Sequence, residues 1–190
     1  MKWRGQTASA VDEAKAENLI LYICRQMEDC LEFGAVVLNK VLYYVDHAHY
    51  LKYGKKLTGL SYVKQKFGPT PNPAEFLPIR QRLISSKRLE ETQVEYFGKI
   101  QKRLRALASP DIKVFSRDQV ALIERVISAM SGVNGKGATD LTHEELSWEL
   151  ADLMEELPDY AYLLSEAQFD QADLDWAKKV IHGYTAAAVH

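Results

Sequence analysis

The sequence predicts an α+β fold, mostly α with a small β-hairpin, as a compact helical domain that is winged-helix-like in part. Three observations predict this class. Apolar residues recur at every third or fourth position along most of the chain, which is typical of helices with one buried face. Residues 88–107 instead alternate between apolar and polar, as paired strands do. The 190 residues, 47% of them hydrophobic, suffice for one domain with its own core.

The N-terminal part is expected to form an arm and then two helices. Residues 1–12 have no apolar periodicity and are predicted to be the arm, which leaves 13–190 as a single domain. The first helix is predicted from about Glu13 to Leu31, with an apolar face. Gly34 interrupts the pattern, and a second helix follows it as far as Gly54, where a left-handed C-cap is expected.

The second helix has a regular apolar stripe. Its members are Val37, Leu38, Val41, Leu42, Val45 and Ala48. Residues 60–67 alternate imperfectly, which predicts a short strand or an extended segment. Residues 68–71 read Gly-Pro-Thr-Pro and are expected to be a rigid exit that continues neither helix nor strand, because proline lacks the backbone N–H.

Capping and turn residues predict the later elements. Asn72 as N-cap and Pro73 as first helical residue begin a third helix that runs to about residue 86. The hairpin over 88–107 follows. Ser116 and Gln119 form a capping-box pattern that begins a fourth helix. Further helical stretches are predicted at 139–153 and at about 170–182, within the same domain.

A family resemblance lies in the stretch from residue 38 to residue 69. It contains, in order, a helix with a Lys-Leu-Leu-Tyr-like motif, a Thr-Gly pair, an aromatic strand and a Gly-Pro exit. These are Lys40-Val41-Leu42-Tyr43-Tyr44, Thr58-Gly59, Tyr62-Val63 and Phe67-Gly68-Pro69. The segment resembles the Panacea domain, the SocA-like antitoxin family of prophages and bacterial toxin–antitoxin pairs. The likeness extends over about residues 15–165, and His143 and Trp148 resemble the family's C-terminal His and Trp positions.

The resemblance implies an antitoxin of a bacterial or prophage toxin–antitoxin system, which neutralises a cognate toxin by direct protein–protein binding. Some members resemble proteolytic adaptors that hand the toxin to a AAA+ protease, and this variant stays open, as does a homo-oligomer. The chain is expected not to be an enzyme. The N-terminus lacks the apolar core of a signal peptide and no apolar run is long enough to span a membrane, so a cytoplasmic location is expected.

Charge supports an alternative, a winged-helix-like nucleic-acid-binding phage regulator. Residues 80–105 hold eight Lys or Arg against three Glu, or +5, and the hairpin arginines and lysines could follow phosphates. Residues 140–175 hold twelve Asp or Glu and no Lys or Arg. The two blocks either neutralise each other in the fold or present charged faces to partners. The net charge of −2 argues against nucleic acid and against a membrane.

No catalytic, cofactor or metal site is predicted. His47 and His49 are two residues apart and point to different sides of a helix. His143 has no second histidine at the spacing of a zinc helix, and the loop over 132–137 lacks the pattern of a phosphate-binding loop. Cys24 and Cys30, six residues apart, are expected to remain thiols.

The toxin-binding surface is predicted on the outward side of the second helix and the segment after it, because aromatics mixed with long polar side chains are typical of interfaces. The predicted interface residues are Tyr44, Asp46, His47, Tyr62, Lys64, Gln65 and Phe67. A second set is assigned to the structural motif rather than to binding. It comprises Lys40, Tyr43, Gly54, Thr58, Gly59, Gly68, Pro69, His143 and Trp148.

Overall fold

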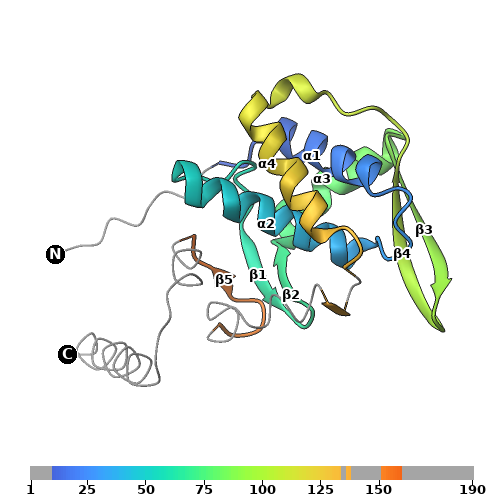
Figure 1. The fold of residues 1–190 in the computed structure, drawn as a ribbon. Helices are drawn as coiled ribbons and strands as arrows, with labels where there is room; N and C mark the ends of the chain where they lie inside the picture. The colour runs from blue at the N-terminus through green and yellow to red at the C-terminus, as the bar shows by residue number, and fades with distance from the viewer. Residues whose placement is uncertain (1–9, 134–135, 138–150, 160–190) are drawn as a thin grey trace, which may run out of the picture.

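The computed structural model describes residues 10–133, 136–137 and 151–159 (Figure 1). Residues 1–9 of the predicted arm, residues 139–150 of the helix predicted at 139–153, the helix predicted at 170–182 and most of the acidic block therefore lie outside the described residues, as do His143 and Trp148.

In the described residues four α-helices form the body of the domain, and with small antiparallel sheets they confirm the predicted fold class (Figure 1). They are α1 (Glu13–Gln26), α2 (Ala35–Tyr53), α3 (Pro73–Ser85) and α4 (Arg117–Met130). Their ends follow the predicted signals. Gly54 ends α2 with φ of 69°, and Asn72 and Ser116 accept hydrogen bonds from the first turns of α3 and α4.

The first helix is shorter than predicted, because α1 ends at Gln26 rather than near Leu31. A turn of non-helical backbone follows. The guanidinium of Arg103 donates to the carbonyl oxygens of Glu28 at 2.9 Å and Cys30 at 3.1 Å. Arg103, more than 70 residues away in sequence, thus replaces the helical hydrogen-bond donors of these carbonyls. The local apolar pattern gives no indication of this contact.

A three-stranded antiparallel sheet packs beside α2, with the order β2-β1-β5. Its strands are β1 (Tyr62–Gln65), β2 (Gly68–Pro71) and β5 (Glu156–Leu157). The prediction that residues 68–71 form no strand is wrong. Strand β2 lies at the sheet edge, where proline is tolerated because one side of the strand needs no ladder donor. The prediction of helix as far as residue 153 is also wrong over 151–153, where turns lead into β5.

The predicted hairpin is present as β3 (Leu89–Tyr96) and β4 (Lys99–Ala106), which pair along their whole length. Figure 1 shows it at one side of the molecule, away from β5. Its two-residue turn has positive φ at both Phe97 (47°) and Gly98 (71°). A 3-10 turn, η1 (Ile112–Val114), leads from β4 to α4.

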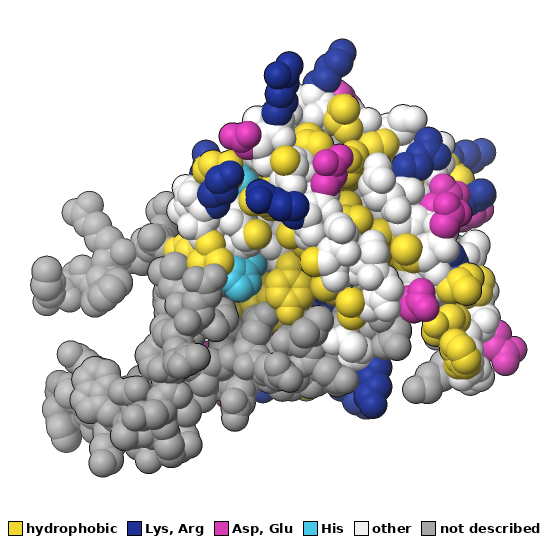
Figure 2. Space-filling model, in the orientation of Figure 1, with side chains coloured by type: hydrophobic (Ala, Val, Ile, Leu, Met, Phe, Trp, Pro, Cys, Tyr) yellow, Lys and Arg dark blue, Asp and Glu magenta, His cyan; other side chains and the backbone are white. Residues whose placement is uncertain are grey.

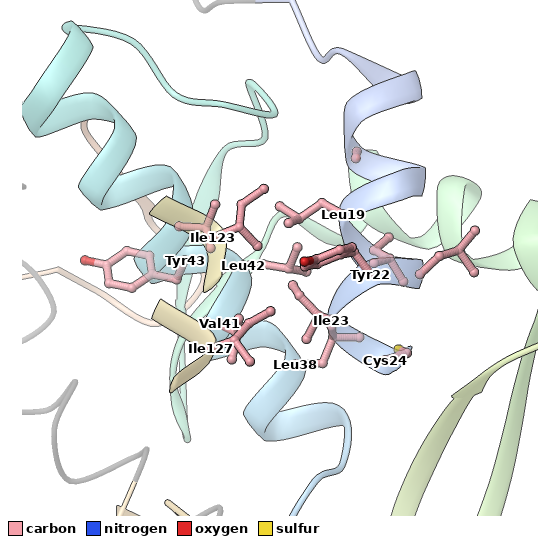
Figure 3. Close-up of a cluster of buried hydrophobic side chains, with 14 of the residues drawn as sticks. Leu19, Tyr22, Ile23, Cys24, Leu38, Val41, Leu42, Tyr43, Ile123 and Ile127 are labelled. Atoms are coloured by element: carbon pink, nitrogen blue, oxygen red, sulfur yellow. The ribbon is translucent and has the colours of Figure 1, made fainter. Parts of the chain in front are cut away.

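The core lies between α1, α2 and α4, as Figure 3 shows. Leu19 and Ile23 of α1 face Leu42 of α2, and Ile123 and Ile127 of α4 close the cluster. Cys24 is buried and Cys30 is half-buried, and both are free thiols as predicted. Burial raises the pKa of the Cys24 thiol to about 12.

Candidate interaction surface

Asp46 is the centre of a buried polar network, not part of a surface. Its side chain is on the inner side of α2 and is 0% exposed. The backbone N–H of Thr58 donates to its Oδ1 at 2.8 Å. The hydroxyls of Thr58 and Tyr62 both donate to its Oδ2, the second at 2.8 Å. The prediction that Asp46 faces a partner is therefore wrong in its placement, because this carboxylate holds β1 and its preceding loop against α2.

Burial raises the pKa of Asp46, since water no longer stabilises its charged form. The hydrogen bonds from Thr58 and Tyr62 and the positive charge of Lys56 act in the opposite direction. Lys56 forms a 2.7 Å ion pair with Asp159, just beyond β5. The network thus ties α2, the loop after it and the end of the described chain together.

Tyr62 is also buried, at 1% exposure, which corrects its predicted place on the surface. Its ring meets the buried ring of Tyr43 edge to face, with centroids 5.2 Å apart. Both side chains therefore pack α2 onto β1. Tyr43 was assigned to the structural motif, and its burial fits that role.

Lys40 connects α2 to the edge strand. Its ammonium is buried, at 1% exposure of the residue, and donates to the carbonyl oxygen of Pro69 at 2.8 Å. A charged donor on a buried carbonyl is worth more than a neutral hydrogen bond. The Gly-Pro exit is thus a strand held in place by a lysine, and Gly68 begins it with φ of 94°.

The loop between α2 and β1 depends on glycine. Gly59 has φ of 74°, and a Cβ built there would be 2.6 Å from the carbonyl oxygen of Ala10. The segment before α1 is also tied to this loop, because Asp12 N–H donates to the Thr58 carbonyl at 2.8 Å. The Thr58-Gly59 pair therefore serves both the Asp46 network and close backbone packing.

The remaining predicted interface residues are accessible to different degrees. Tyr44 and His47 are half-buried, with nearly parallel rings whose centroids are 6.4 Å apart. Phe67 is 55% exposed at the β1–β2 turn. The Lys64 ammonium donates to the Ala151 carbonyl at 2.8 Å, and Gln65 lies 3.7 Å from the Met154 sulfur. Residues 151–157 thus contact part of the surface predicted for the toxin.

Sequence reasoning missed the apolar tip of the β3–β4 hairpin. Phe97 is 88% exposed and Ile100 is 69% exposed. Figure 2 shows hydrophobic side chains gathered at this tip. The available signal was a Phe-Gly turn, where a two-residue hairpin usually has Asn-Gly or Asp-Gly.

A groove of about 650 Å³ lies between this tip and the start of α2. It is lined by Glu32, Gly34, Ala35, Val36, Val37, Tyr96, Phe97, Ile100, Gln101, Lys102 and Lys136. We call these residues the tip groove.

The basic residues of 80–105 are largely engaged within the domain. Arg80 pairs with Glu91 at 2.6 Å, and Arg88 pairs with Glu17 of α1 at 2.7 Å. Arg105 pairs with Glu90, while Arg103 binds backbone carbonyls. Helix α1 and strand β3 thus supply counter-charges to part of the basic block. The nucleic-acid-binding alternative stays a prediction. Fewer Lys and Arg side chains of residues 80–105 are available to contact phosphates than the sequence alone suggested.

Two absences hold for the described part of the chain. Within residues 10–133, 136–137 and 151–159, no three His, Cys, Asp or Glu side chains are grouped so as to hold a metal ion. No helix in those ranges has the length and apolar character needed to cross a membrane.

The fold and these contacts define a small α+β domain whose α2–β1–β2 unit is held by buried polar side chains. The family model of the SocA-like antitoxin Panacea domain matches residues 38–149, more than half of the chain. The chain therefore belongs to the SocA-like antitoxin family with a Panacea domain, as its sequence motifs predicted. The curated proteins and the solved structures yield no match.

Proposed function

We propose that this protein neutralises a cognate toxin of a bacterial or prophage toxin–antitoxin pair by direct binding in the cytoplasm, without catalysis of its own. The observation that carries the proposal is the family match over residues 38–149. It spans α2 from residue 38 onward, both strands of the first hairpin, α3, the β3–β4 hairpin and α4, whereas α1 and β5 lie outside it.

The described surface offers anchors for such binding. Neutralisation by occlusion needs burial of about 1,200–2,000 Å² in total, with a few aromatic or large apolar side chains contributing most of the affinity. Phe67 and Phe97 are exposed aromatics at the turns of two antiparallel strand pairs.

The experiment is co-expression with the protein encoded by the adjacent gene, scored by growth. The expected result is that the neighbour alone stops growth and that this chain restores it, with the two proteins co-purifying as a complex. A matched control is Leu42→Asp, which places a charge in the core and should abolish rescue. A neighbour that is harmless alone, or that stays toxic beside the wild-type chain, contradicts the proposal.

The same strain separates direct neutralisation from delivery to a protease. We expect the toxin to persist at its full level in rescued cells, bound to this chain. If the chain acts as an adaptor to a AAA+ protease, the toxin level falls on co-expression, and rescue is lost in a host that lacks the protease. Toxin abundance on an immunoblot, in hosts with and without the protease, distinguishes the two.

A further inference from the structure

We propose that the tip groove is the place where the cognate toxin docks, through a toxin segment that presents a large apolar side chain beside a carboxylate. This inference rests on the proposed function and assigns it a surface. The surface differs from the one predicted from sequence, which lies on α2 and the β1–β2 turn.

The first argument is that the hairpin tip carries an apolar side chain at a position that disfavours it. Phe97 occupies the first central position of a two-residue turn with φ of 47°, a backbone region that is unusual for a bulky residue. Asn or Gly there would relieve the backbone and expose no apolar surface. The strained backbone and the 88% exposed ring of Phe97 both destabilise the free domain. A contact with a partner that buries the ring would offset these two costs.

The second argument is that the groove beneath the tip is preformed. The side-chain amide of Gln101 donates to the Glu32 carbonyl at 3.1 Å, which fixes β4 to the turn before α2. Gly34 lies so close to Gln101 that a Cβ on it would be 2.9 Å from the Gln101 Cγ. The apolar side chains of Val36 and Ile100 therefore line a groove whose walls are joined by these two contacts of the Gln101 side chain. Such a groove accepts an apolar side chain at low ordering cost.

The third argument is the charge of the groove. Its ionisable side chains, apart from Tyr96, are one glutamate and two lysines, and the glutamate, Glu32, is hydrogen-bonded to Tyr96. Lys102 and Lys136 are exposed at the groove, and Lys102 reaches Glu91 only at 3.6 Å. An acidic group on the occupant complements these lysines.

The same charges favour a different protein over a second copy of this chain. In a two-fold dimer built on this patch, residues beside the axis meet their own counterparts, so a lysine at the axis would face the same lysine of the other copy. Like charges brought together in this way oppose association. A toxin segment with a carboxylate next to its apolar anchor has no such penalty.

The test measures toxin affinity and fold stability together on Phe97→Asn. The probe is the protein encoded by the adjacent gene, titrated into the purified full chain by calorimetry. Loss of a buried aromatic anchor should weaken binding at least about tenfold, with the melting temperature unchanged or raised because Asn-Gly suits the turn. Ile112→Asn on η1, a 51% exposed apolar residue outside the groove, is the matched control and should bind as the wild type does.

A second variant tests the charge argument separately. Lys102→Glu should weaken binding about threefold to tenfold at low salt, and the difference should shrink as salt is raised. Wild-type affinity in both Phe97→Asn and Lys102→Glu overturns the docking surface while leaving the proposed function intact. A wild-type dimer that Phe97→Asn dissociates, with toxin binding unchanged, assigns the groove to a second copy and also overturns it. Absence of any binding by the wild-type chain overturns the proposed function and this inference together.

Discussion

Residues 38–71, which we call the signature unit, differ from the tip groove in which side chains are buried and which are exposed. In the signature unit the polar side chains of Lys40, Asp46 and Thr58 are at most 1% exposed. Their hydrogen bonds join α2 to β2 and to the loop before β1. At the tip, Phe97 and Ile100 are apolar and mostly exposed. Buried polar groups fix one arrangement of α2, β1 and β2, whereas exposed apolar groups gain from a partner.

This difference distinguishes the residues that identify the family from those that we propose bind the toxin. Most motif side chains that identify the family are buried and serve the fold, whereas Tyr44 is half-buried and Phe67 is 55% exposed. The docking surface that we propose, the tip groove, lies on elements with weaker motif content. A partner that varies from one family member to another would be met by such elements without altering the fold.

The largest expected effect is on stability, from removing the central carboxylate. Asp46→Ala leaves the Thr58 N–H and the hydroxyls of Thr58 and Tyr62 buried without their acceptor. We expect the free energy of unfolding to fall by about 3–5 kcal/mol, measured by urea denaturation. Asp29→Ala, at an exposed turn, is the control and should change it by no more than about 0.5 kcal/mol. Equal effects of the two substitutions would refute the view that this network holds the domain.

A smaller loss of stability is expected at the start of β2. Gly68 has φ of 94°, which side chains with a branched Cβ strongly disfavour. Gly68→Val should therefore lower the free energy of unfolding by about 1–3 kcal/mol. Lys66→Val, on the same turn without a positive φ, serves as the comparison in the same thermal melt. A melting temperature equal to that of the wild type would mean that the strand can begin without this backbone angle.

The tip should respond in the opposite direction. Phe97→Asn is expected to raise the free energy of unfolding by about 0.5–1 kcal/mol, because it relieves a strained turn and removes exposed apolar surface. Thermal unfolding followed by circular dichroism measures it. Destabilisation by this change would show that Phe97 serves the fold after all, and the contrast between the two regions would fail.

The smallest expected effect is a dependence on pH. Burial raises the pKa of Asp46, so the folded chain keeps this proton to a higher pH than the unfolded chain. The stabilisation from protonation is complete below the ordinary value of 3.8 and is lost as the pH rises through the raised value. Relative to Asp46→Asn, the wild type should therefore lose stability as the pH increases above the ordinary value of 3.8 and through the raised pKa. Urea unfolding at a series of pH values measures the difference, and a constant or growing wild-type advantage would contradict it.

Local signals predicted much of the fold correctly. The C-terminal end of α2 follows from Gly54, and the N-terminal end of α4 follows from the Ser116–Gln119 capping box. Both signals act within a few residues. Strand β2 was missed because whether proline is tolerated depends on which side of the strand has a neighbour. The early end of α1 was missed because Arg103, far along the chain, binds the carbonyls there.

The candidate surface was predictable only in part. The apolar stripe assigns the inner side of α2 to other residues and so predicts Asp46 on the surface, yet α2 is covered on more than one side. Its partners, Thr58 and Tyr62, lie 12 and 16 residues away, and no pattern within the helix indicates them. Phe97 could have been found from its position in a Phe-Gly turn, but only after the turn itself had been located.

The most direct test of this account is amide hydrogen exchange of the chain, alone and bound to the protein encoded by the adjacent gene. In the free chain, amides of 40–46 and 62–65 should exchange slowest, because they lie in the buried unit. On binding, we expect new protection over 31–37 and 95–102, which contain every residue of the tip groove except Lys136, and little change over 40–65. New protection confined to 44–47 and 62–68, with the hairpin unchanged, would contradict the account and return the interface to α2 and the β1–β2 turn.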